Sequence, residues 1–201
     1  MADDLALIHQ QILACRRCAL AGFPIQGPPI FSGSVHARLM VIGQAPGRVE
    51  VNETHQPFSG SAGKRLFSWF QQVGWDEKTF RQTFYMTSVT KCFPGPNRSG
   101  RGDRAPTRKE QRLCEEWLLA EIVLVDPEVV VPVGKMAIER FLGRGRKLVE
   151  IIGGRYQIDG RIVIPLPHPS GASAWIQVQA HRVLIRRALQ QLAIVKEELG
   201  L

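Results

Sequence analysis

Short apolar runs alternate with amphipathic stretches along most of this chain. The apolar runs predict strands over residues 38–42, 84–89, 129–134 and 161–165. Apolar residues at helical spacing predict helices over 4–14, 62–72, 135–142 and 174–199, and a further helix near Pro106 with Thr107 as its N-cap and Glu110 in the capping-box position. Strands that alternate with helices favour a parallel sheet covered on both faces. The pattern therefore predicts an α/β fold, a three-layer α/β/α sandwich around a short, mostly parallel central sheet.

Length and composition fit one ordinary globular domain. The 201 residues can build one substantial core, and no linker, repeat or low-complexity tract divides them, so we expect a single domain over 1–201. No apolar run is long enough to cross a bilayer, and the acidic start Met1–Asp4 lacks the layout of a secretory signal. We expect a cytoplasmic protein that acts as a monomer and has no membrane partner.

The net charge of +8 changes this picture, because a basic surface attracts polyanions. The basic side chains form two groups in the sequence: Arg98, Arg101, Arg104, Arg108, Lys109 and Arg112, and then Arg140, Arg144, Arg146 and Lys147. We expect neither group to be balanced by nearby carboxylates, as a structural salt-bridge face usually is. Charge alone makes nucleic acid a plausible partner, and a generally basic, well-solvated surface is the alternative.

Three polar or glycine-rich turns carry the candidate chemistry: Gly43–Gly47, Gln56–Gly63 and Pro167–Ser170. Open α/β sheets bind their ligands at the carboxyl ends of the strands, so we expect the three turns to form the walls of one pocket. An ordinary connecting turn is the alternative for Gly43–Gly47, and a core side chain is the alternative for Phe58. His168, held between two prolines, is a poor choice for core filling.

The four cysteines occur as a C-x2-C pair, Cys15 and Cys18, followed by Cys92 after a predicted strand and by Cys114 one helix later. A disulfide is not expected in a cytoplasmic chain, which leaves a metal site, a redox dithiol or buried thiols. Four thiolates suit either zinc or an iron–sulfur cluster, and their spacing does not separate the two.

Together these motifs resemble the uracil-DNA glycosylase superfamily, most closely its iron–sulfur branch, family 4. The family's C-x2-C-x-L, K-C-R-P and P-T-x-x-E motifs correspond to Cys15–Leu20, Lys91–Pro94 and Pro106–Glu110 here, and Cys114 is the final cysteine. The resemblance implies a structural [4Fe–4S] cluster on Cys15, Cys18, Cys92 and Cys114. It also implies a monofunctional hydrolase that removes uracil, or another deaminated base, from DNA in base excision repair. The segment between Cys92 and Pro106 looks longer than is usual in the family and is a candidate for an additional DNA contact.

The resemblance assigns roles within the three turns. It implies that the backbone N–H groups of Gln44 and Ala45 bind a carbonyl of uracil, that Phe58 stacks on the flipped base, and that His168 donates a hydrogen bond to the departing base anion. The expected catalytic residues are His168, Gln44 and Glu50, and the expected substrate-binding residues are Gly43, Gln44, Ala45, Phe58, Ser88 and His168. A bulky wedge into the minor groove is absent from Gly171–Ser173, which leaves Trp175 or Ile176 as the hypothetical wedge.

Two positions depart from the family pattern. Gln44 stands where the family has glutamate, and an amide cannot act as a general base, so Glu50 is the nearest substitute. Ser88 stands where the family has the asparagine that contacts uracil at two points. A serine hydroxyl cannot make that contact alone, so we expect weaker activity on uracil or a preference for hypoxanthine or xanthine.

Two other functions stay open at this point. One is a DNA-binding or damage-sensing protein of the same fold with little or no excision activity, which the replacements at Gln44 and Ser88 motivate. The other is a zinc-stabilised nucleotide-binding protein unrelated to repair.

Overall fold

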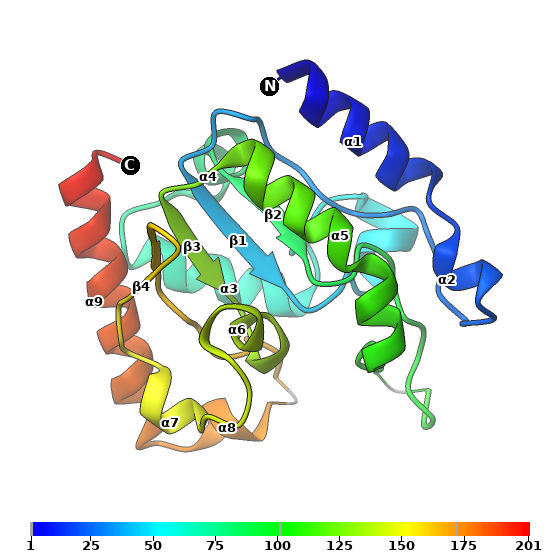
Figure 1. The fold of residues 1–201 in the computed structure, drawn as a ribbon. Coiled ribbons are helices and arrows are strands. Elements are labelled where there is room, and N and C mark those ends of the chain that lie inside the picture. The colour runs from blue at the N-terminus through cyan, green and yellow to red at the C-terminus, as the bar shows by residue number, and fades with distance from the viewer. Residues whose placement is uncertain (1, 101, 172) are drawn as a thin grey trace.

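One five-stranded sheet, in the order β2-β1-β3-β5-β4, lies at the centre of the protein, with helices on both faces (Figure 1). The computed structural model describes residues 2–100, 102–171 and 173–201. The strands are β1 (Leu39–Gly43), β2 (Tyr85–Ser88), β3 (Val129–Pro132), β4 (Tyr156–Ile158) and β5 (Arg161–Val163). The helices are α1 (Ala2–Ala14), α2 (Arg17–Leu20), α3 (Ser61–Gln71), α4 (Glu77–Thr83), α5 (Arg108–Val125), α6 (Lys135–Leu142), α7 (Leu148–Ile151), α8 (Ala174–Gln177) and α9 (His181–Leu199), and η1 (Glu50–Thr54) is a π-helical turn.

Four of the strands run parallel, so their carboxyl ends share one edge of the sheet. β1 pairs in parallel with β2 and β3, and β3 pairs in parallel with β5. β4 is antiparallel to β5 and forms the edge of the sheet. This arrangement confirms the predicted fold class. The sequence pattern missed β4, because three half-exposed residues carry too little periodicity to mark a strand.

The alternation of side chains along β1 divides the core into two layers. Leu39 and Val41 belong to the apolar cluster that includes residues of α3, α4 and α9, whereas Met40 and Ile42 belong to the cluster that includes residues of α1 and α5. All four side chains are fully buried. A parallel strand covered on both faces therefore appears in the sequence as a continuous apolar run, which is why β1 was predictable.

The cap predicted at the start of α5 is present. Thr107 Oγ1 accepts from the N–H of Glu110, and the Glu110 carboxylate accepts from the N–H of Thr107 at 2.6 Å, which completes a capping box.

The helix predicted over 174–199 is two helices, α8 and α9. The chain turns between them, where the ring of His181 stacks on Trp175 and its Nδ1 lies 2.8 Å from the Trp175 carbonyl oxygen. Tertiary packing, which the apolar spacing does not reveal, separates the two.

Candidate active site and cysteine site

A cavity of about 680 Å³ opens at the carboxyl ends of the parallel strands. The three polar turns identified in the sequence all contribute to its walls, together with Thr87 and Ser88 at the end of β2. The sequence-predicted residues that line it are Gly43, Gln44, Ala45, Glu50, Phe58, Ser88 and His168. The fold therefore brings every predicted catalytic and substrate-binding residue into one pocket.

Phe58 lies over the end of β1 in a turn with unusual backbone geometry. Its φ is +54°, in the left-handed region that costs free energy for a residue with a side chain. Arg81 donates hydrogen bonds to the carbonyl oxygens of Pro57 at 2.6 Å and Phe58 at 2.9 Å, which hold the turn in place. A Cβ on Gly43 would lie 2.8 Å from the ring, and a Cβ on Gly63 would lie 1.8 Å from the Phe58 carbonyl oxygen. Both glycines are therefore required for the ring to reach the pocket.

Glu50 joins two of the pocket turns. Its Oε2 accepts from the N–H of Gly47 at 3.1 Å, and its Oε1 accepts from the N–H groups of Ser59 at 3.0 Å and Gly60 at 2.8 Å. The residue is 8% exposed, so these charge-assisted hydrogen bonds form largely away from water. The carboxylate thus fixes the relative position of the two turns, and both of its oxygens are engaged by backbone donors.

His168 contributes a neutral imidazole to the pocket wall. Burial lowers the pKa of His168 below its ordinary value of 6.5, so the ring is uncharged at neutral pH. The N–H of Ser170 donates to Nδ1 at 3.3 Å, which assigns the ring proton to Nε2. The ring packs against Gly134, where φ is +86° and a Cβ would lie 3.1 Å from Cδ2. His168 can therefore act as a neutral Nε2–H donor.

The hydroxyl of Ser88 is turned toward the backbone that follows it. It donates to the carbonyl oxygen of Thr90 at 2.7 Å, so it can offer a ligand only its acceptor lone pairs. The carbonyl oxygen of Ser88 accepts from Lys91 Nζ at 2.7 Å, and Lys91 also forms an ion pair with Glu121. The Lys91 and Glu121 side chains are 1% and 0% exposed. A buried ion pair thus holds the end of β2 where it enters the pocket.

Sequence reasoning missed residues that support the pocket from a distance. Arg81 lies on α4, a helix that the sequence pattern did not reveal, and Arg65 donates to the Pro169 carbonyl oxygen at 2.9 Å and so holds the turn after His168. Neither arginine carries a sequence signal, because its partner is remote along the chain. Asp103 also lines the pocket, and it does carry a signal, being the sole acidic residue between Glu77 and Glu110 in a basic stretch.

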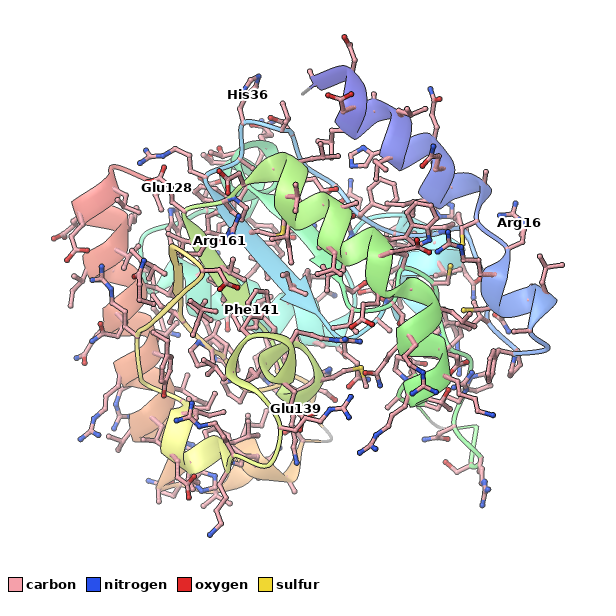
Figure 2. All side chains as sticks on the ribbon, viewed as in Figure 1. Arg16, His36, Glu128, Glu139, Phe141 and Arg161 are labelled. Carbon is pink, nitrogen blue, oxygen red and sulfur yellow. The ribbon has the colours of Figure 1, made fainter. Side chains whose placement is uncertain are left out.

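The four cysteines line a second cavity, of about 350 Å³, between the N-terminal segment, the loop after β2 and α5. Trp117 Nε1–H donates to Cys15 Sγ at 3.4 Å, and the N–H of Lys91 donates to Cys114 Sγ at 3.3 Å. Arg16 lies at the surface beside this site (Figure 2) and donates to the Cys15 carbonyl oxygen at 2.8 Å. Among the described residues, no three Cys, His, Asp or Glu side chains are arranged to hold a metal ion. The geometry is that of four thiols around a shared cavity.

Burial and mutual repulsion disfavour free thiolates at this site. Burial, reinforced by the neighbouring cysteines, raises the pKa of Cys18 to about 11 and that of Cys92 to about 12. The pKa of Cys114 is also raised, mainly by burial. A positively charged group that accepts several thiolates would offset both effects. Four thiols around one cavity are therefore compatible with a metal centre that displaces their protons on binding.

Comparison with known proteins places this fold and pocket in a family. Residues 30–193 match the family described as the Uracil DNA glycosylase superfamily. The chain belongs to this superfamily. It is 27% identical to the type-4 uracil-DNA glycosylase of Thermotoga maritima over 196 residues, 96% of each chain. It is 31% identical to the type-4 enzyme of Pyrobaculum aerophilum over 79% of this chain and 76% of that one, and 28% identical to the type-5 enzyme of Thermus thermophilus over 69% and 72%. The resemblance to family 4 is thereby confirmed.

Nearby carboxylates pair with some side chains of the two basic groups and leave others exposed. Arg98, Arg108, Lys109 and Arg112 in the first group, and Arg144, Arg146 and Lys147 in the second, are exposed. Arg104, however, pairs with the fully buried Glu110, and Arg140 pairs with Glu115, so the expectation that carboxylates balance neither group is wrong at these two positions. Arg101 lies outside the described residues. None of the described helices could cross a membrane.

The two candidate wedge side chains differ in burial, Ile176 being buried and Trp175 half-buried. Ile176 is 9% exposed and packs into the core, and the Trp175 ring stacks on His181 with centroids 4.2 Å apart. The burial of Ile176 contradicts its role as a wedge, whereas the half-buried Trp175 stays a prediction for that role. Ala172, in the adjacent loop, lies outside the described residues.

Proposed function

We propose that this protein is a monofunctional DNA glycosylase that hydrolyses the N-glycosidic bond of uracil, or of another deaminated base, in DNA during base excision repair. The observation that carries the proposal is that Phe58, Ser88 and His168 line one shared pocket in a chain whose relatives include type-4 uracil-DNA glycosylases. Its volume of about 680 Å³ leaves room for a flipped nucleotide.

Each wall of the pocket supports one requirement of the reaction. The Phe58 ring provides a face on which the flipped base stacks. The Nε2–H of His168 donates to the base as the glycosidic bond breaks and negative charge develops on it, and the N–H groups of Gln44 and Ala45 bind a base carbonyl. Glu50 holds in register the two turns that carry Phe58 and the N–H groups of Gln44 and Ala45, so these groups need little reorganisation during the reaction.

We propose that Cys15, Cys18, Cys92 and Cys114 hold a [4Fe–4S] cluster. The four thiols line one cavity, and the resemblance to the type-4 uracil-DNA glycosylases favours a cluster over zinc there. When bound, the cluster supplies the positive charge that keeps the thiolates deprotonated. The cysteines would then tie the N-terminal segment, the loop after β2 and α5 together beside the DNA. Iron and acid-labile sulfide analysis of anaerobically purified protein tests this: about four of each per chain is the expected result, and zinc alone contradicts it.

Ser88 bears on which base is removed. With its O–H donated to Thr90, the hydroxyl can accept one hydrogen bond from a base but cannot read two adjacent atoms of uracil. A ring N–H of uracil, hypoxanthine or xanthine can equally donate to it. We propose a relaxed preference among these deaminated bases and slower release of uracil. Ser88→Asn is expected to shift preference toward uracil, and an unchanged preference would contradict this role.

Base release from labelled oligonucleotides tests the whole proposal. The panel contains uracil, hypoxanthine, xanthine and 5-hydroxymethyluracil, each in single- and double-stranded DNA, with His168→Ala as the control. We expect release of at least one base by the wild-type protein and its loss in His168→Ala. Binding without release would instead favour a damage-sensing protein, the alternative that the replacements at Gln44 and Ser88 support. A cytoplasmic location and a monomeric state stay predictions from the sequence.

A further inference from the structure

Asp103 brings a carboxylate to the pocket from the loop that precedes α5. The loop folds back on itself through a bridge between Pro96 and Asp103 and a hydrogen bond from the N–H of Asn97 to the Gly102 carbonyl oxygen at 2.7 Å. In Figure 1 this loop lies beside the start of α5, on the side toward which β1 points. Asp103 lines the pocket, and its Oδ2 lies 2.8 Å from the position that a Cβ would take on Gly47.

The base of this loop is firmly held. Arg104, the next residue, forms two hydrogen bonds with the Glu110 carboxylate, and its N–H donates to the Gly95 carbonyl oxygen at 3.0 Å. Burial alone would raise the pKa of Glu110, but the hydrogen bonds from Arg104 and Thr107 hold it below its usual value, so the pair is charged on both sides. The position of Asp103 is therefore set by the ion pair between Arg104 and the buried Glu110 and by a helix cap.

The other acidic or amide groups near the turn are less suited to accept a proton. Gln44 has no carboxylate, and Glu50 uses both oxygens to accept from three backbone N–H groups. Within the described part of the chain, the Asp103 carboxylate has no hydrogen bond or ion pair, and it is exposed to the pocket's solvent. A lone acid in a basic stretch weakens attraction for DNA phosphates, so its presence calls for another role.

We propose that Asp103 is a catalytic residue that orients and activates the water for hydrolysis in place of the carboxylate missing at Gln44. This role rests on the glycosylase function proposed above. The C1′–N bond breaks with its electron pair leaving on the base, the water oxygen bonds to C1′, and one water proton passes to Asp103. The same carboxylate stabilises the positive charge that develops on the sugar before the water adds.

Single-turnover base release tests this role, with DNA binding measured separately on an oligonucleotide that contains an abasic site. Asp103→Asn is expected to slow release by about 100-fold, the lower range for a general base, with binding changed less than twofold. Asp159→Asn, on the exposed turn between β4 and β5, is the matched control and should leave both quantities unchanged.

Two rescue experiments separate chemistry from loop structure. Added formate should restore part of the rate in Asp103→Ala, with saturation, and should leave the wild type and the Asp159→Asn control unaffected. Gln44→Glu introduced into Asp103→Asn should also recover activity, because it returns a carboxylate to the same pocket.

The failures of the two proposals are distinguishable. Wild-type rates in Asp103→Asn, or a joint loss of rate and binding with no rescue by either route, overturn the role of Asp103 and leave the glycosylase function standing. No release of any base by the wild-type protein overturns the glycosylase function, and the role of Asp103 falls with it.

Discussion

Replacing Gly43 with alanine tests whether the Phe58 ring must lie over the end of β1 for base release. The new Cβ would lie 2.8 Å from Phe58 Cζ and 3.0 Å from Cε1. Carbon atoms pack best at about 3.5–4.0 Å, so the ring has to move by about 1 Å. The backbone of Gly43 has no left-handed φ, and the atoms it would meet belong to a half-buried ring that can shift. The fold should therefore survive while the stacking surface is displaced.

The size of the effect follows from the stacking energy. Loss of a base–aromatic stack costs roughly 1–3 kcal/mol. Since about 1.4 kcal/mol corresponds to a factor of ten, Gly43→Ala should lower the single-turnover rate of base release by about 5- to 150-fold. The unfolding temperature should fall by only a few degrees.

Phe58→Leu provides the matched comparison, because it removes the aromatic face directly. If Gly43→Ala acts through the ring, the double variant should be no slower than Phe58→Leu alone. Gly171→Ala is the control on another pocket loop, where the nearest atom would lie 3.8 Å from the new Cβ. A Gly43→Ala protein with wild-type activity and thermal stability would refute the reasoning, and so would fully multiplicative effects of Gly43→Ala and Phe58→Leu.

Three further predictions concern stability. Lys91→Met leaves the buried Glu121 carboxylate uncompensated, so urea unfolding should show that the free energy of unfolding falls by about 3–5 kcal/mol. Glu121→Gln in the same chain should recover part of this loss, and a loss below about 1 kcal/mol would argue against the ion pair. Thr107→Ala removes the side-chain half of the capping box at α5 and should cost about 1 kcal/mol, whereas Thr107→Ser should restore it, and equal stability of both variants would count against the cap. The pKa of His168 is lowered on folding, so the unfolded chain binds more protons and the free energy of unfolding falls as pH decreases below about 6.5. His168→Gln should therefore reduce the difference in unfolding free energy between about pH 7.5 and 5.5, and an unchanged difference would exclude this cause.

The parts of this fold that the sequence predicted share a local cause. β1 and β3 are apolar throughout because both faces of a parallel strand are buried, and the cap of α5 is written in Thr107 and Glu110. The short elements α2, α4 and α7 and the edge strand β4 were missed, because a few residues carry no usable periodicity.

The pocket shows the same division between local and tertiary information. Its turns were recognisable from glycine, proline and histidine at the ends of apolar runs. The residues that hold these turns were not recognisable, since Arg81 on α4 donates a hydrogen bond to the Phe58 carbonyl oxygen and Lys91 forms an ion pair with Glu121. Neither contact leaves a pattern in the sequence, because a hydrogen bond between distant residues requires only compatible side chains.

The sequence by itself determined the order of the longer strands and helices, the identity of the candidate groups and the family, because these depend on residue type and spacing. The tertiary structure decided what those groups can do. It engages both oxygens of Glu50 with backbone donors, turns the Ser88 hydroxyl toward Thr90 and brings Asp103 beside Gly47. The physical reason is that a side chain's chemistry depends on its hydrogen-bond partners and its exposure, and both are set by segments that meet only after folding.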